Sequence, residues 1–226
     1  MNQHAWSTRT LGDKDVATIS SGGTPSRAHP EYFNGGIRWV KSGDLNDSRI
    51  SETSETISEQ GLRNSAAKIL PANTVLIAMY GATVGKTALL KVEAATNQAV
   101  CTIQPNPRVY NPVFLQYLLI LLRPELLRER YGGAQPNISQ AIIRSLELPC
   151  PIPLEQQKIA AVLWKIQRAL ELEEKLTATS RELKHAAMRQ LFARGLRGEA
   201  QQESTFHKAV LGDPLRRTAC HRARRR

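Results

Sequence analysis

The sequence predicts an α+β fold: a mixed α/β globular domain over residues 1–150, followed by a long coiled-coil-type α-helix. In the globular region, short β-type runs alternate with turns rich in Gly, Pro and Asn. Residues 154–194 contain neither Gly nor Pro and repeat apolar residues every three or four positions. With 226 residues, 41% of them hydrophobic, the chain is long enough to bury a core and to carry an appendage.

Three runs of β-branched and apolar residues predict strands in the globular domain. They cover residues 37–41, 74–80 and 99–103. Turn sequences separate them at residues 22–25, 34–36 and 105–107. One helix is expected after the last of these turns, because Asn111 suits the N-cap and Pro112 the first helical position. Its apolar residues recur up to Leu122, and Arg123 and Pro124 then stop the apolar run.

The start of this helix also resembles a catalytic motif. Adenine methyltransferases contain Asn-Pro-Pro followed by an aromatic residue, and residues 111–114 read Asn-Pro-Val-Phe. The second proline is absent here, no Gly-rich turn of the kind that binds a methyl donor precedes the motif, and helix capping accounts for both Asn111 and Pro112. We therefore interpret the motif as a helix start.

Residues 81–87, Gly-Ala-Thr-Val-Gly-Lys-Thr, resemble a phosphate-binding loop. That loop requires four residues between its glycines, so that successive amides can surround a phosphate, whereas Gly81 and Gly85 are separated by three. Residues 88–93 are too short and too β-prone to form the helix that follows such a loop. The segment is therefore predicted to be a tight turn after the strand at residues 74–80.

The long helix is expected after the prolines at positions 149, 151 and 153, which keep the connector extended. About forty residues at 1.5 Å each give roughly 60 Å of helix. The predicted interface residues form one apolar stripe: Ile159, Leu163, Ile166, Leu170, Leu176, Leu183 and Leu191. Such a stripe needs a partner, which favours a coiled coil. The alternative is two shorter helices folded back on each other near residues 177–180.

The net charge of +11 is unevenly distributed. Residues 201–226 contain seven Lys/Arg and two Asp/Glu, whereas residues 11–150 contain fourteen and twelve. Any binding of nucleic acid by the nearly neutral globular domain therefore depends on a local patch. We expect residues 199–226 to form a disordered basic tail.

The three cysteines, Cys101, Cys150 and Cys220, match neither a disulfide framework nor a metal site, which favours a reducing, cytoplasmic setting. The first ten residues lack the apolar core of a signal peptide. The longest apolar run, at residues 113–122, is interrupted by Gln116 and is too short to cross a bilayer.

Six motifs occur in one order along the chain: GGTPS (22–26), YFNGGIRWVKSGDL (32–45), YGATVGKT (80–87), TNQAV (96–100), GGAQPNIS (132–139) and PLEQQ (153–157). Together they resemble the specificity subunit of type I restriction-modification enzymes, over about residues 11–198. The resemblance implies a DNA target recognition domain at residues 1–150 and a long-helix spacer or dimerisation region at residues 151–198.

The resemblance also implies that this chain binds double-stranded DNA and contains no catalytic group and no cofactor. Methylation and ATP-driven cleavage belong to separate modification (methyltransferase) and restriction (translocase/endonuclease) subunits. Most members of the family have two recognition domains, each reading half of a bipartite site, whereas this chain has one. We hypothesise a half-subunit that forms a homodimer through the long helix, or else a truncated fragment. An enzyme that modifies DNA or uses ATP by itself is the alternative from another class.

Residues in these motifs are candidates for DNA contact: Lys41, Tyr80, Thr83, Lys86, Gln98, Gln135 and Asn137. Lysine can contact phosphate or guanine, and Gln or Asn can contact adenine. The alternative is a structural role in turns. We favour that role for most of them, because specificity subunits that read different sequences share these motifs. Base-reading residues are then expected in the intervals 47–68 or 123–131.

Overall fold

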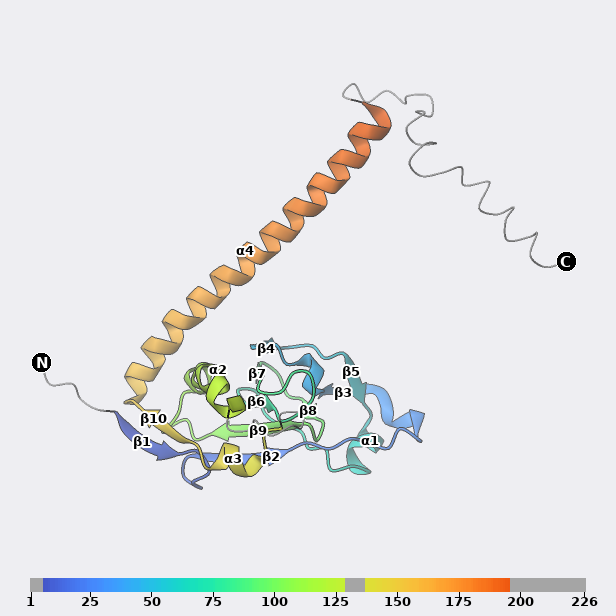
Figure 1. The fold of residues 1–226 in the computed structure, drawn as a ribbon. Coiled ribbons are helices and arrows are strands. Elements are labelled where there is room, and N and C mark those ends of the chain that lie inside the picture. The colour runs from blue at the N-terminus through green and yellow to red at the C-terminus, as the bar shows by residue number, and fades with distance from the viewer. Residues whose placement is uncertain (1–5, 129–136, 196–226) are drawn as a thin grey trace, which may run out of the picture. The chain divides into compact units, whose positions relative to one another are not determined.

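The structure is a computed structural model that describes residues 6–128 and 137–195. Its internal contacts divide the chain into two units, the first ending at Trp164 and the second beginning at Lys165. The predicted tail at residues 199–226 lies outside the described residues. The described part confirms the α+β class, because it combines mixed β-sheets with a long C-terminal helix (Figure 1).

The strands of the first unit form three sheets. The five-stranded sheet has the order β2 (Ala17–Ser21), β9 (Val100–Pro105), β6 (Val75–Ala78), β7 (Thr87–Leu90) and β4 (Ser48–Ile50). The three-stranded sheet has the order β5 (Glu55–Ile57), β3 (Phe33–Val40) and β8 (Ala95–Thr96), and β1 (Ser7–Thr10) pairs with β10 (Glu147–Cys150). Neighbouring strands are antiparallel, except in the parallel pairs β4–β7 and β3–β8. The predicted strands at residues 37–41, 74–80 and 99–103 are confirmed as β3, β6 and β9.

Strand β6 is buried on both faces, which explains its continuous apolar sequence. Val75 and Ile77 point into the cluster that also contains the helix residue Leu115, whereas Leu76 and Ala78 belong to a second cluster. Alternate side chains of a strand face opposite sides of the sheet. The five-stranded sheet therefore has a core on each side.

Helix α2 (Pro112–Arg128) covers one of these cores, and its predicted start is confirmed. The Asn111 side-chain oxygen accepts hydrogen bonds from the backbone N–H groups of Val113 (3.0 Å) and Phe114 (3.1 Å). The helix continues past Pro124, where the sequence predicted a stop to the apolar run. Its last turn is retained because Leu126 is buried in the core.

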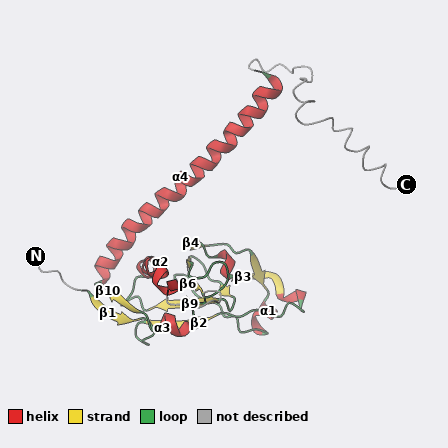
Figure 2. Cartoon of the chain, in the orientation of Figure 1, coloured by secondary structure: helices red, strands yellow, loops and turns green. Residues whose placement is uncertain are grey.

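The remaining helices of the first unit are short: η1 (Pro30–Tyr32), η2 (Ser42–Asp44), α1 (Glu59–Arg63) and α3 (Gln140–Arg144). Helix α4 (Pro153–Arg194) is continuous (Figure 2), so the alternative of two shorter helices near residues 177–180 is wrong. In the part of the chain that the structure describes, no helix is both long and apolar enough to cross a membrane.

Candidate nucleic-acid interface

The segment at residues 79–86 connects β6 to β7 as a hairpin turn. Gly81 and Gly85 both have positive φ, +87° and +77°, which glycine adopts without strain. The backbone N–H of Gly85 donates to the Ala78 carbonyl (2.8 Å), and that of Lys86 donates to the Thr83 carbonyl (2.9 Å). Because these amides are already bonded within the turn and a strand follows them, the segment does not form a phosphate-binding loop.

Backbone hydrogen bonds join the segments that carry three of the predicted DNA-contact residues, Tyr80, Gln98 and Asn137. The N–H of Met79 donates to the Ala99 carbonyl (2.9 Å), and the Met79 carbonyl accepts from the N–H of Ile138 (2.6 Å). All three predicted side chains are exposed, and the Gln98 amide oxygen accepts from the Thr24 hydroxyl. Gln135 lies outside the described residues.

Two further hydrogen bonds attach the segment that contains Lys41 to the segments of Tyr80 and Gln98. The Thr83 hydroxyl in the hairpin donates to the Ser42 carbonyl (2.7 Å), and the N–H of Asn97 donates to the Val40 carbonyl (2.9 Å). Four segments that are distant in sequence therefore carry the six predicted residues that the structure describes. The bond made by Thr83 has a structural role, as the turn interpretation predicts.

Lys41 takes part in an ion-pair network that the sequence did not reveal. Its ammonium lies 2.6 Å from one carboxylate oxygen of Glu55, and Arg27 lies 2.7 Å from the other. The Lys41 ammonium, and then the Arg27 guanidinium, lower the pKa of Glu55 below its usual value of 4.5. The Arg27 guanidinium also lies 4.2 Å from the centre of the Phe33 ring and 5.6 Å from that of Trp39. This network places a second cation, Arg27, beside Lys41.

The hairpin is attached to helix α2 by a second network. Arg123 donates to the Gly85 carbonyl (2.8 Å) and pairs with Asp47, whose carboxylate also accepts from the N–H of Thr87 (3.0 Å). Asp47 and Arg123 belong to the intervals in which base-reading residues were expected, and here they hold the hairpin. Lys86 is half-buried and has no ion-pair partner among the described residues, so its charge is not neutralised within them.

The GGTPS motif has a structural explanation. A Cβ atom at Gly22 would lie 1.9 Å from the Thr96 carbonyl oxygen, and one at Gly23 would lie 2.4 Å from the backbone of Ala66. The Trp39 indole N–H donates to the Gly23 carbonyl (3.1 Å). Both glycines are therefore required for close packing between the three-stranded sheet and its surroundings.

Two buried groups of the first unit have raised pKa values. Burial raises the pKa of the Cys101 thiol to about 12, which keeps it neutral and unreactive near neutral pH. Burial also raises the pKa of Tyr110, whose hydroxyl donates to the Leu148 carbonyl (3.0 Å). Among the described residues, no group of His, Cys, Asp and Glu side chains is arranged to hold a metal ion.

Gln156, in the PLEQQ motif, fixes the first turns of α4 to the globular domain. It is fully buried; its amide donates to the carbonyls of Val109 and Pro151 (both 2.8 Å), and its oxygen accepts from the N–H of Asn111 (2.8 Å). Sequence reasoning missed this role, because a polar residue near a helix start usually faces solvent.

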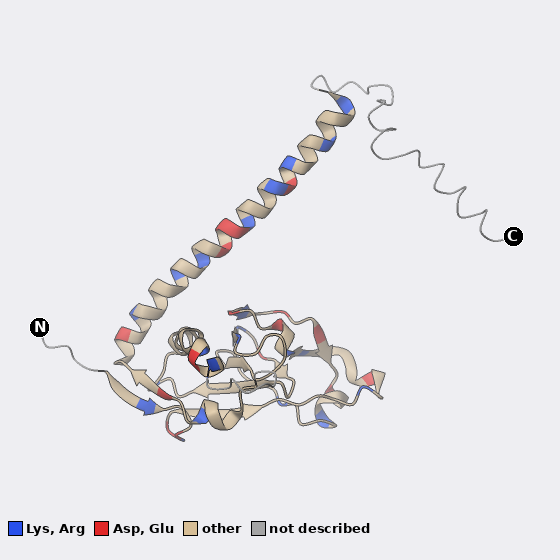
Figure 3. Cartoon of the chain, viewed as in Figure 1, with Lys and Arg blue, Asp and Glu red and all other residues tan. Residues whose placement is uncertain are grey.

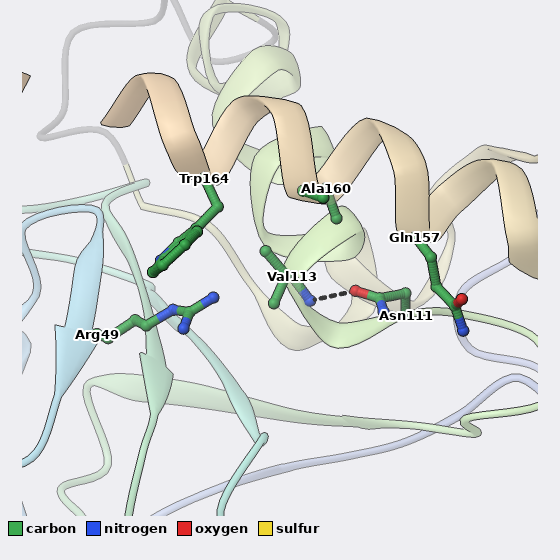
Figure 4. Close-up of a pocket in the computed structure, with 7 residues that line it drawn as sticks. Arg49, Asn111, Val113, Gln157, Ala160 and Trp164 are labelled. Atoms are coloured by element: carbon green, nitrogen blue, oxygen red, sulfur yellow. Dashed lines mark hydrogen bonds between the residues drawn. The ribbon is translucent and has the colours of Figure 1, made fainter. Parts of the chain in front are cut away.

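Beside this contact lies an open pocket of about 300 Å³ (Figure 4). Its lining consists of Arg49, Asn111, Val113, Gln157, Ala160, Ala161 and Trp164. The Arg49 guanidinium lies 5.3 Å from the centre of the Trp164 ring, which is 40% exposed. The pocket is mostly apolar and lies between the first turns of α4 and the rest of the first unit.

The predicted interface residues of α4 remain largely exposed within the chain. Ile159 is half-buried and Leu163 is 37% exposed, both within the first unit. Exposure is higher in the second unit, ranging from 47% to 69% for Ile166, Leu170, Leu176, Leu183 and Leu191. The described residues therefore leave the apolar stripe of the second unit without a cover.

The chain belongs to a known family: residues 4–179 match the type I restriction modification DNA specificity domain. Among curated relatives, it is 30% identical over 166 residues to the type I restriction enzyme MjaIX specificity subunit of Methanocaldococcus jannaschii, covering 72% of this chain and 38% of that protein. It is 27% identical over 192 residues to the EcoR124I/EcoR124II specificity subunit of Escherichia coli, covering 77% and 47%. The chain thus spans less than half the length of these relatives.

Solved structures show the same fold. The HsdS subunit of Thermoanaerobacter tengcongensis matches with a TM-score of 0.58 and 21% identity, over 87% of this chain and 47% of that one. The S subunit of the type I system of M. genitalium matches with a TM-score of 0.59 and 20% identity, over 85% and 47%. These likenesses support the fold, a globular α+β domain followed by a long helix.

Proposed function

We propose that this chain reads one half of a bipartite double-stranded DNA target and has no catalytic group of its own. The observation that carries the proposal is the joining of four motif segments, which brings the segments of Lys41, Gln98 and Asn137 to the hairpin of Tyr80 and Lys86, a cation with no ion pair among the described residues. Lysines suit phosphates, and amide side chains suit base edges. The bonded hairpin amides argue against an ATP-using enzyme, and the Asn111 cap argues against an autonomous methyltransferase.

We further propose that the chain works as a half-subunit, pairing through α4 with a second copy and assembling with modification and restriction subunits. Two facts support this: the matched part of the chain covers 38% and 47% of the two curated relatives, and the stripe on α4 is exposed among the described residues. Under this proposal, methyl transfer and ATP-driven cleavage remain with the other subunits.

Methylation mapping tests the proposal. Cells that express this chain with its modification subunit should acquire adenine methylation at one symmetric bipartite sequence, and the purified chain alone should transfer no methyl groups. Absence of methylation would indicate a non-functional fragment, and methyl transfer by the chain alone would show an enzyme.

A matched pair of variants tests the position of the interface. Lys86 precedes β7 and Lys91 follows it, so the two lysines lie at opposite ends of one strand. We expect Lys86→Ala to weaken DNA binding by the complex and to reduce the slope of log K against log salt by about one. Lys91→Ala should leave both unchanged. Equal effects of the two variants would remove the hairpin from the interface.

A further inference from the structure

Within the second unit, two columns of residues run along one face of α4. Each column repeats every seven residues, and the two are offset by three and four positions, as in a coiled-coil seam. The columns are Ile166, Glu173, Ser180 and Ala187, and Leu170, Thr177, Lys184 and Leu191. All eight side chains are exposed.

The polar residues of the seam occupy its middle. Apolar side chains lie at both ends, Glu173 and Lys184 lie further in, and Thr177 and Ser180 lie at the centre. An open hollow on this helix is lined by Leu170, Glu173, Glu174, Thr177, Ala178 and Arg181, so it covers the first half of the seam. Small central side chains permit close approach of a second helix, so the seam is suited to pairing along its whole length.

Read in the reverse direction, the seam is complementary to itself. An antiparallel second copy would pair Ile166 with Leu191, Leu170 with Ala187, Glu173 with Lys184, and Thr177 with Ser180. These four pairs share one two-fold axis, between Ala178 and Thr179. Leu176 and Leu183, the most exposed leucines of the helix at 68% and 69%, flank the seam on either side of this axis.

Two other arrangements, a parallel pair and a shifted antiparallel pair, lack this complementarity. In a parallel pair in register, Glu173 would face Glu173 and Lys184 would face Lys184. An antiparallel pair shifted by seven residues would place Lys184 against Ile166 in one direction and Glu173 against Leu191 in the other. Each of these arrangements buries a charge without its counterion, which is costly.

Neither charge is satisfied on its own helix. Among the described residues, the ion pair within α4 is Arg168–Glu171 (3.3 Å), and neither Glu173 nor Lys184 takes part in one. Figure 3 shows that charges of both signs are distributed along the helix, so net charge does not select the partner. The positions of Glu173 and Lys184 along the seam therefore select the partner.

We propose that Glu173 and Lys184 set the antiparallel orientation and the register in which α4 pairs with a second copy of this chain. A polar or charged residue within an otherwise apolar seam is a known means of specifying register. The inference rests on the self-pairing proposed above and adds to it the residues that determine its geometry.

Charge reversal in the full-length chain tests the inference, with the dimer dissociation constant measured by sedimentation. Glu173→Lys alone and Lys184→Glu alone should each raise that constant by at least about tenfold, since each places like charges together twice. The double variant Glu173→Lys/Lys184→Glu should restore dimerisation. Mixing the two single variants should give a mixed dimer. Lys175→Glu and Glu182→Lys make the same charge changes on the opposite face and should have no effect.

The outcomes distinguish the inferred register from the two proposals on which it rests, self-pairing through α4 and DNA recognition. If the single reversals dimerise as tightly as the parent while Leu170→Asp does not, self-pairing stands and the register is overturned. If the double variant remains monomeric, the antiparallel pairing of these two residues is overturned. A parent chain that stays monomeric at all concentrations overturns both self-pairing and register, whereas failure of DNA recognition appears only in the methylation map.

Discussion

Leu115 of α2 is fully buried, whereas Leu176 and Leu183 of α4 are 68% and 69% exposed. The same side chain thus serves two purposes in one chain. In the first unit, leucines on α2 close a core against the five-stranded sheet. In the second unit, leucines of the helix remain exposed, and the described residues do not cover them.

Polar side chains also differ between the two units in whether they have bonding partners within the described part of the chain. Gln156, Asp47 and Glu55 are bonded within the first unit, each to two or more partners. Glu173 and Lys184 have no ion-pair partner among the described residues. These three groups of the first unit are therefore satisfied within the fold, whereas Glu173 and Lys184 have no such ion pair in the part of the chain that the structure describes.

The largest effect is expected from truncating a leucine in each region. Leu115→Ala should lower the free energy of unfolding of the first unit by about 2–5 kcal/mol, because it leaves a cavity in the core. Leu170→Ala should change that quantity by less than about 0.5 kcal/mol but weaken dimerisation. Urea denaturation at low protein concentration and sedimentation measure the two quantities separately. If Leu170→Ala destabilised the first unit as much, the division between the regions would be wrong.

A smaller effect is expected at two adjacent glutamines near the start of α4, within the first unit. Gln156→Ala leaves the Asn111 N–H and two carbonyls without their partners, and should cost about 1–3 kcal/mol in unfolding free energy. Gln157→Ala, at an exposed position, should cost almost nothing. Equal losses would show that Gln156 does not hold α4 on the domain.

The N-cap of α2 should contribute less to the free energy of unfolding than Gln156 does. Asn111→Ala removes the acceptor for the N–H groups of Val113 and Phe114 and should cost about 1 kcal/mol. Asn111→Asp keeps an acceptor at the helix N-terminus and should retain most of the stability. If both variants were equally destabilised, the capping explanation for the Asn-Pro motif would fail.

Features set by local chemistry could be predicted from the sequence. The apolar run of β6, the Asn111-Pro112 helix start and the unbroken stretch of α4 all follow from period, capping and the absence of Gly or Pro. The pairing of β1 with β10 could not be predicted, because both strands are short, half-exposed and far apart in sequence. Continuation of α2 past Pro124 depends on tertiary packing of Leu126, which no local signal shows.

The same distinction between local sequence signals and tertiary contacts holds for the candidate interface. The motifs supplied its residues, but only the fold shows which segments meet. Pairing of β3 with β5 brings Glu55 to Lys41, and the short helix η2 presents the Ser42 carbonyl to Thr83. Such pairs join residues 14 and 41 positions apart, beyond the reach of any helical or strand period.

The smallest predicted effect concerns the charge of Glu55, which is satisfied inside the first unit. Because its pKa in the fold lies below the usual value of 4.5, the carboxylate stabilises the fold at pH values above 4.5, and this contribution disappears as the pH falls through the lowered pKa. The side chain is partly exposed, so we expect less than about 1 kcal/mol.

Urea unfolding of the parent chain and of Glu55→Gln, from about pH 6.5 down to about pH 3, measures this contribution. The parent should be more stable at the upper end, and the two curves should converge at the lower end. Glu52→Gln, at an exposed position with no ion pair among the described residues, should follow the parent throughout. A constant offset at every pH would show that Glu55 stabilises the fold by packing and not through its ion pairs with Lys41 and Arg27.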